Sequence, residues 1–212
     1  ADSEVFVTPM AAVAGAVADE MLETMLVEAK KPDSCIDHLR KIYVNNGGDI
    51  AFWLNEGESF SIGVVDNPQI PELNAKVSLA HESQVRGIAT SGWRGRSLSL
   101  GIADAVTVLA KSAAVADVAA TLIANEVNVD FTGIEKRPAS EVKDDSDLGM
   151  IPVTVVVPDL AEDKIYIALE QGAKSARKFI KDGKITAAYL SLQKQTLVIE
   201  NDDKIERAII NN

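Results

Sequence analysis

Cysteine and histidine are almost missing from this 212-residue sequence. The single cysteine, Cys35, excludes an internal disulfide framework and a zinc site made of clustered cysteines. The two histidines, His38 and His81, are too few for a multi-histidine metal site. A catalytic role for Cys35 is also disfavoured, because its acidic neighbours oppose formation of the thiolate. These absences remove two common classes of metal centre and leave no obvious thiol enzyme.

Basic residues are outnumbered by acidic ones, 21 against 32, which gives a formal net charge of −11. Such an acidic chain is unsuited to nucleic acids or anionic membranes, because their phosphates would be repelled. No run of eighteen apolar residues is free of charge, so no membrane span is predicted. Residues 1–8 lack the pattern of a signal peptide. We therefore expect a cytoplasmic protein with no nucleic-acid or membrane partner.

Hydrophobic periodicity predicts three long helices, over residues 10–29, 112–127 and 161–181. Short strand-like runs fill most of the remaining chain. The predicted strands cover residues 41–44, 50–54, 59–65, 76–80, 84–90, 96–100, 105–109, 153–157, 185–192 and 196–199. Short strands with a few long helices are typical of the α+β class.

The chain divides into two loosely similar halves, each with strands and a long helix. The first half covers residues 1–133 and the second covers 151–212, and the polar stretch 134–150 between them is predicted to be a linker or loop. Residues 201–212 are expected to be frayed or to form a peripheral helix. We predict one α+β domain in which a mostly antiparallel sheet is backed by long helices.

The helix predicted over 112–127 is apolar on nearly all sides, which is typical of a buried helix. Its polar exceptions, among them Asp117 and Thr121, are four residues apart and share one face. A buried carboxylate is costly unless it is paired or binds a metal, and this pair offers two oxygens suited to Mg²⁺. The alternative is structural: Asp117 caps a loop or pairs with Arg94 or Arg96, and Thr121 bonds to its own helix.

A glycine-rich turn, Asn45-Asn46-Gly47-Gly48-Asp49, lies between two predicted strands. Backbone amides in such a turn can form a nest that binds an anion or a nucleotide. A plain hairpin turn explains the same residues. The candidate ligand-binding residues here are Asn46, Gly47, Gly48 and Asp49.

A second candidate loop, Thr90-Ser91-Gly92-Trp93-Arg94-Gly95-Arg96-Ser97, is locally basic. In an acidic protein this composition favours an anionic ligand, because arginine makes bidentate contacts with phosphate or carboxylate. The alternative is a surface loop that balances nearby acids. Trp93 either stacks on a flat ring or covers the core. The candidate ligand-binding residues are Thr90, Ser91, Gly92, Arg94 and Arg96.

Four motifs follow one another in an order that resembles the ApbE-like superfamily, and in particular a short branch of it. They are Pro-Met-Ala-Ala-Val-Ala-Gly-Ala from Pro9, Asn-Gly-Gly-Asp-Ile from Asn46, Ala-Thr-Ser-Gly from Ala89, and Ser-Leu-Gly-Ile-Ala-Asp-Ala-Val-Thr-Val-Leu-Ala from Ser99. The helix with Asp117 follows the last motif. The resemblance is strong over residues 9–127 and weak over 152–192.

The resemblance implies a T-fold-like domain, and the namesake of the superfamily is a Mg²⁺-dependent FAD:protein FMN transferase. In the transferases an Asp and a Thr one helical turn apart hold Mg²⁺, together with a backbone carbonyl at the start of the alanine-glycine helix. Those positions match Asp117 and Thr121, with Ala11 or Ala12 for the carbonyl. The Gly-Gly-Asp turn and the Thr-Ser-Gly loop border the flavin nucleotide. The resemblance also implies a homodimer, and a strand-rich segment that precedes residue 1 in relatives.

One departure from the transferases bears on the reaction. They carry a His-Ile-Ile-Asp-Pro-x-Thr-Gly stretch after the Thr-Ser-Gly loop, whereas this chain has only residues 93–105 there, without that stretch. We therefore consider three hypotheses for the function. The first is Mg²⁺-dependent binding or turnover of a small anionic ligand such as FAD or FMN. The second is a non-catalytic binding or assembly protein that keeps the fold. The third is a small-molecule hydrolase that uses Ser91 or Thr90.

Overall fold

A computed structural model describes residues 7–31, 34, 39–67, 70–200 and 209–211 of the chain. Outside these ranges lie Cys35, His38 and most of the tail after residue 200. The structure therefore does not test the predictions made for these residues. Within the described residues, no helix has both the length and the apolar character needed to cross a bilayer.

Three long helices form where periodicity predicts them. A short 3-10 turn, η1 (Pro9–Ala12), leads into α1 (Val13–Ala29), and the others are α2 (Ala113–Glu126) and α4 (Glu162–Lys181). Ser112 caps α2, because its side chain accepts a hydrogen bond from the Val115 amide. All three predicted helices are therefore confirmed to within a few residues.

The central sheet has six strands in the order β1-β2-β5-β6-β9-β10, and every pair is antiparallel. Strands β2 and β5 are neighbours because the chain between them leaves the sheet to form β3 and β4, and β4 lies between β3 and β11 in a second sheet. The strands of the two sheets are β1 (Lys41–Asn46), β2 (Asp49–Leu54), β3 (Ser59–Val64), β4 (Ala75–Ala80), β5 (Gly87–Ser91), β6 (Ala105–Ala110), β9 (Ile185–Leu192), β10 (Gln195–Glu200) and β11 (Ile209–Asn211).

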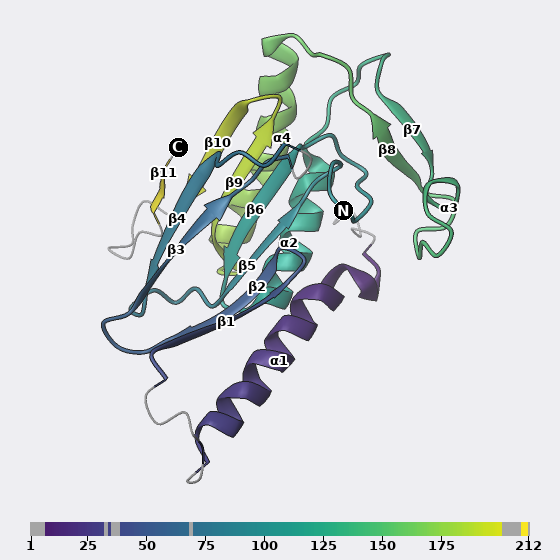
Figure 1. The fold of residues 1–212 in the computed structure, drawn as a ribbon. Helices are drawn as coiled ribbons and strands as arrows, with labels where there is room; N and C mark the ends of the chain where they lie inside the picture. The colour runs from purple at the N-terminus through teal and green to yellow at the C-terminus, as the bar shows by residue number, and fades with distance from the viewer. Residues whose placement is uncertain (1–6, 32–33, 35–38, 68–69, 201–208, 212) are drawn as a thin grey trace.

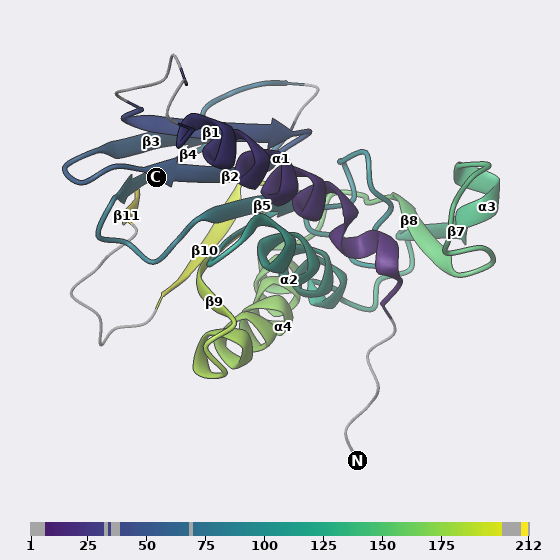
Figure 2. The same ribbon diagram turned by 90° about the horizontal axis from the view of Figure 1, so that it is seen from below.

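The central sheet is covered on both faces (Figures 1 and 2). Helices α1, α2 and α4 lie on one face and strands β3 and β4 on the other. Alternation along β6 shows this directly: Val106 and Val108 join the core under the helices, whereas Leu109 joins the core under β3 and β4. The predicted mixed architecture, with a mostly antiparallel sheet backed by long helices, is confirmed.

Two predicted segments differ from the structure. Residues 96–100, predicted as a strand, form bends and irregular structure without ladder pairing. Residues 134–150, predicted as a linker or loop, contain β7 (Glu135–Pro138) and α3 (Ala139–Val142), and β7 pairs with β8 (Pro152–Val156) in a small ribbon that projects from one end of the molecule (Figure 1). At the other end of the chain, 209–211 form a strand and not part of a helix.

Candidate functional site

A cavity of about 750 Å³ opens between the central sheet and strands β3 and β4. The sheet register explains its position, because the start of β2, the end of β5, the start of β6 and the end of β9 all meet at one end of the sheet. Eight of the eleven candidate site residues line this cavity. They are Asn46, Gly47, Gly48, Asp49, Thr90, Ser91, Gly92 and Arg96.

The glycine-rich turn is a two-residue hairpin loop between β1 and β2. Both glycines have positive φ, 74° at Gly47 and 115° at Gly48, as this tight turn requires. The Gly48 amide donates to the side chain of Asn45 at 2.9 Å, and Asn46 Nδ2 donates to the Ala14 carbonyl at 3.0 Å. One amide of the predicted anion nest is therefore already occupied, and the turn serves mainly as a rigid wall.

Arg96 supplies positive charge beside this wall. Its guanidinium lies against Gly47, where a Cβ atom would come within 1.7 Å of Arg96 Nη2. Arg96 is exposed, and Lys143 from the end of α3 also lines the cavity and is exposed. Neither side chain forms an ion pair within the described ranges of the chain. These two cations give the cavity a positive rim in an acidic protein.

Arg94 does not line the cavity. Its Nε donates to Asp104 Oδ1 at 2.6 Å, and its guanidinium stacks on the Trp93 ring with 4.5 Å to the centroid. Trp93 Nε1 donates to Asp104 Oδ1 at 3.1 Å, and the backbone amide of Gln193 donates to Asp104 Oδ2 at 2.6 Å. Asp104 thus fixes the loop after β5, and the prediction that Arg94 belongs to the ligand-binding wall is not supported by this geometry.

The floor of the cavity contains a buried carboxylate that the sequence did not reveal. Asp66 follows β3 and is only 9% exposed. Its Oδ2 accepts hydrogen bonds from the Tyr189 hydroxyl at 3.0 Å and the Ser191 hydroxyl at 2.6 Å. Burial raises the pKa of Asp66, and these two hydroxyl donors oppose the rise. No sequence motif links Asp66 to Tyr189 and Ser191, which are more than 120 positions away and meet it only through folding.

Asp49 and Asp117 form a pair of interacting acids at the other side of the turn. Burial and, to a lesser extent, nearby Asp117 raise the pKa of Asp49, Arg96 lowers it, and together they bring it to about 7. Burial also raises the pKa of Asp117. Neither Asp117 nor Thr121 is among the residues that line the cavity, so Asp49 is the member of this pair that the cavity reaches.

Asp117 has a structural role as well. Its Oδ2 accepts a hydrogen bond from the Gly15 amide in the first turn of α1, at 3.0 Å. Conversely, Asp19 of α1 accepts hydrogen bonds from the Ala113 and Ala114 amides in the first turn of α2, both at 2.9 Å. Each helix thus caps the other through a carboxylate within its own first two turns. Asp117 therefore has a structural partner on one of its two oxygens, but this partner is a helix start, not the loop, Arg94 or Arg96 of the structural alternative.

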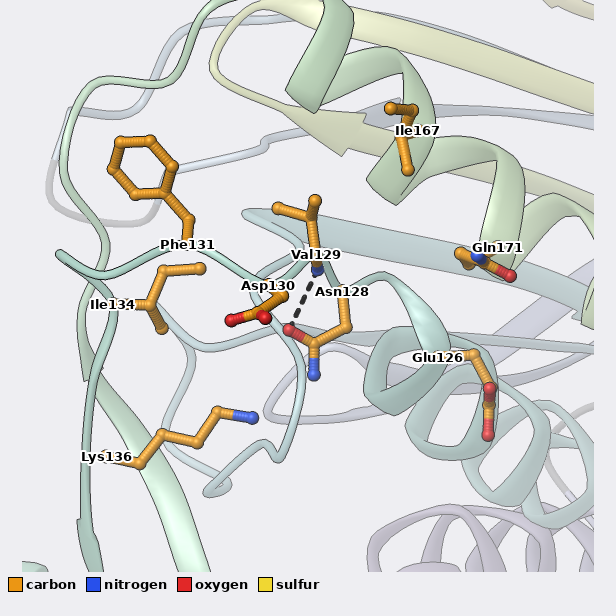
Figure 3. Close-up of a pocket in the computed structure, with 9 residues that line it drawn as sticks. All are labelled: Glu126, Asn128, Val129, Asp130, Phe131, Ile134, Lys136, Ile167 and Gln171. Atoms are coloured by element: carbon orange, nitrogen blue, oxygen red, sulfur yellow. Dashed lines mark hydrogen bonds between the residues drawn. The ribbon is translucent and has the colours of Figure 1, made fainter.

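A second pocket, of about 580 Å³, lies between the end of α2, β7 and α4 (Figure 3). Lys136 points into it but donates to the Leu100 carbonyl at 2.6 Å, and burial lowers the pKa of Lys136. Asp130 and Glu126 add two carboxylates, and Phe131 is exposed. Two carboxylates face one lysine in this pocket, and that lysine is bonded to a carbonyl, so the cavity beside Arg96 is the better candidate for an anionic ligand.

Comparison with known proteins shows the family. The model of the family described as "AbpE bacteria" matches residues 1–207, and the chain belongs to this family. Similar curated proteins include the UPF0280 protein of Methanopyrus kandleri, which is 34% identical over 151 residues, or 71% of this chain and 56% of that protein. The UPF0280 protein of Methanobrevibacter smithii is 39% identical over 121 residues, or 57% and 46% of the two chains. The aligned part is about half the length of these curated relatives.

Proposed function

We propose that this T-fold-like protein binds a small phosphorylated ligand of nucleotide size, such as FMN or FAD, in the cavity beside Arg96. The observation that carries the proposal is the convergence of two separate motifs, the glycine turn and the Thr-Ser-Gly loop, on one cavity with a positive rim. A volume of about 750 Å³ is in the range of small-molecule and cofactor sites. Arg96 and Lys143 would hold the phosphate through charge-assisted hydrogen bonds.

Mg²⁺ fits the residues beside the turn. Asp49 and Asp117 are desolvated carboxylates that repel each other, and a divalent cation would remove that repulsion. In the described part of the chain, no group of three or more histidine, cysteine or acidic side chains is arranged to hold a metal. A Mg²⁺ ion here would therefore take Asp117 and Asp49 with the Thr121 hydroxyl or a carbonyl, and keep several waters. When bound, it would neutralise phosphate charge.

Ligand binding is tested by titrating the protein with FMN and with FAD and following flavin fluorescence, with and without Mg²⁺. Arg96→Ala should weaken binding at least tenfold, because a hydrogen bond to a charged group is lost. Arg137→Ala, on the projecting ribbon, is the matched control and should bind as the wild type does. Wild-type protein that binds neither flavin, or an Arg96→Ala variant with unchanged affinity, would overturn the proposal.

Turnover distinguishes an enzyme from a binding protein. Water attack on the pyrophosphate of FAD would break the P–O–P bond and release FMN and AMP, which chromatography detects. Release that requires Mg²⁺ and disappears in Asp117→Ala supports the enzyme, and tight binding without release supports the non-catalytic protein. The hydrolase alternative has less support, because the Thr90 hydroxyl pairs with the Thr107 hydroxyl at 2.8 Å and not with a general base.

We also propose a homodimer formed through the helical face. Val13, Val17 and Met21 are four residues apart on α1, and their exposed fractions are 41%, 44% and 51%. An apolar depression of about 390 Å³ is lined by Ala12, directly before α1, by α2, by Phe179 of α4 and by Lys184, which follows α4. Exposed apolar residues gathered on one side of a molecule are typical of a protein–protein interface.

A further inference from the structure

The floor of the cavity holds a polar atom that nothing in the structure satisfies. Asp66 Oδ1 is buried and receives no hydrogen bond from any described residue, whereas Oδ2 of the same carboxylate receives two. The other polar groups around it are paired: Thr107 with Thr90, and the Asp66 amide with Asn74 Oδ1 at 2.9 Å. A buried acceptor without a donor is costly, and native structures seldom keep one without a reason.

One other buried side-chain atom in the described ranges lacks a partner, and it makes a useful contrast. Thr154 Oγ1 lies in β8, and Thr154 does not line the cavity. Asp66, in contrast, lines the cavity and is held in place by hydrogen bonds on both its backbone and its Oδ2. The orphaned oxygen therefore belongs to a rigid residue in the wall of a site large enough for a ligand.

The cavity is also polarised in charge. Its exposed cations, Arg96 and Lys143, lie at the rim, and its most buried charged residue is the carboxylate of Asp66. A simple anion would gain from the rim but would be repelled by the floor. The arrangement is complementary to a ligand with two different ends, an anionic one and one that carries hydrogen-bond donors.

We infer that Asp66 is a specificity-determining residue, whose free oxygen accepts a hydrogen bond from an N–H at the buried end of a phosphorylated heterocycle. The inference rests on the proposed function, because it assumes that a phosphorylated ligand occupies this cavity. FMN has the required form, with a phosphate at one end and a ring imide N–H at the other. Rejection of a ligand that lacks the N–H follows from the cost of leaving the carboxylate unpaired.

The test compares FMN with its N3-methyl derivative, in which the imide N–H is replaced by a methyl group. Wild-type protein should bind FMN at least tenfold more tightly than the methylated compound. Asp66→Asn keeps the size of the side chain and an oxygen for Tyr189 and Ser191, but places an amide where an acceptor is needed. This variant should lose the discrimination, and Thr154→Val, which removes the other unpartnered atom, should retain it.

The outcomes separate the two proposals. If wild-type protein binds FMN and its N3-methyl derivative equally well, the role of Asp66 is wrong and the ligand proposal stands. If Asp66→Asn is folded by circular dichroism and still discriminates as the wild type does, the role of Asp66 is also wrong. If wild-type protein binds neither compound, the flavin proposal itself fails and the inference fails with it.

Discussion

At the scale of single residues, the cavity is defined by carboxylates in contrasting environments. Asp104 has three donors and fixes a loop, Asp66 has donors on one oxygen only, and Asp49 faces another acid. A carboxylate whose oxygens both accept hydrogen bonds from protein donors is usually structural, whereas one with an unpaired oxygen or an acidic neighbour is a candidate for binding a ligand or a cation. The number of hydrogen-bond donors around each aspartate thus separates a structural acid from the acids that we propose as binding residues.

The raised pKa of Asp49 predicts that the stability of the fold depends on pH. Its pKa is about 7 in the folded protein and near 4 in an unfolded chain, so the folded state holds the proton more tightly. The contribution of Asp49 to stability is therefore fully present below pH 4 and is lost as the pH rises to 7. Asp49→Asn should raise the free energy of unfolding at pH 8, by up to about 4 kcal/mol, and change it little at pH 4.

Urea denaturation at the two pH values measures this difference, with the exposed Asp130→Asn as the control. Mg²⁺ added to the wild type at pH 8 should have the same sign of effect, because it would bind the ionised pair and stabilise the folded state. A variant that is equally or less stable than the wild type at pH 8 would contradict the raised pKa.

The two carboxylates that cap helix starts, Asp19 and Asp117, are expected to contribute unequally to stability. Asp19 accepts two amide hydrogen bonds from α2, and Asp117 accepts one from α1 while it repels Asp49. Asp19→Ala should therefore lower the free energy of unfolding by about 2 kcal/mol, and Asp117→Ala by less than half of that. Thermal or urea denaturation measures both, and Glu20→Ala on the exposed side of α1 is the control. Equal losses at the two positions would contradict the arrangement.

At the scale of helices and strands, the sequence predicts the regular elements and misses those that depend on distant partners. The three helices and the strands of the central sheet follow hydrophobic periodicity, because each has one or two buried faces. Residues 96–100 have the composition of a strand but pair with no neighbouring strand, and Asp104 fixes the loop before them through Trp93 and Arg94. Strand β7 is Glu-Lys-Arg-Pro, which has no alternation, and it forms only because β8 lies beside it.

The crossing of α1 and α2 depends on Gly15. A Cβ atom at this position would lie 2.4 Å from the Ala113 carbonyl oxygen and 2.7 Å from the Ala114 amide nitrogen. Both contacts are to backbone atoms, which cannot move aside as a flexible side chain can. Gly15→Ala should separate the two helix starts, break the hydrogen bonds of Asp19 and Asp117, and lower the free energy of unfolding by about 3 kcal/mol.

Chemical denaturation tests this, and Ala16→Ser at the next, exposed position is the matched control. Because the two helices cap each other at this point, Gly15→Ala combined with Asp19→Ala should cost less than the sum of the two single changes. Full additivity, or a stable Gly15→Ala variant, would show that the close approach of the helices is not required.

At the scale of the whole molecule, topology explains why part of the site could be predicted and part could not. The glycine turn and the Thr-Ser-Gly loop are recognisable in sequence, and the β2–β5 pairing brings them together with Arg96. Asp66, Tyr189 and Ser191 carry no local pattern, because they meet only when the β3–β4 pair folds over the end of β9. The spacing of residues along the chain does not predict which side chains meet when one sheet packs on another.

The last prediction concerns the association of two copies of the chain through the helical face, which is the outer surface of α1, α2 and α4 (Figure 2). The exposed end of α4 carries Lys178 and Lys181, whereas exposed Glu20 and Glu23 lie on α1, at the other side of the same helical layer (Figure 2). A two-fold axis near α2 would place the acidic helix of one copy over the basic helix end of the other, with the apolar stripe of α1 between them.

Sedimentation equilibrium should give twice the 22.6 kDa chain mass for the wild type, and Met21→Lys should shift the measured mass toward that of the monomer. Tyr166→Lys on the exposed side of α4 is the control for added charge. Because the proposed interface would combine apolar and charged contacts, salt should weaken it only in part. A wild type that is monomeric at every concentration would refute the dimer.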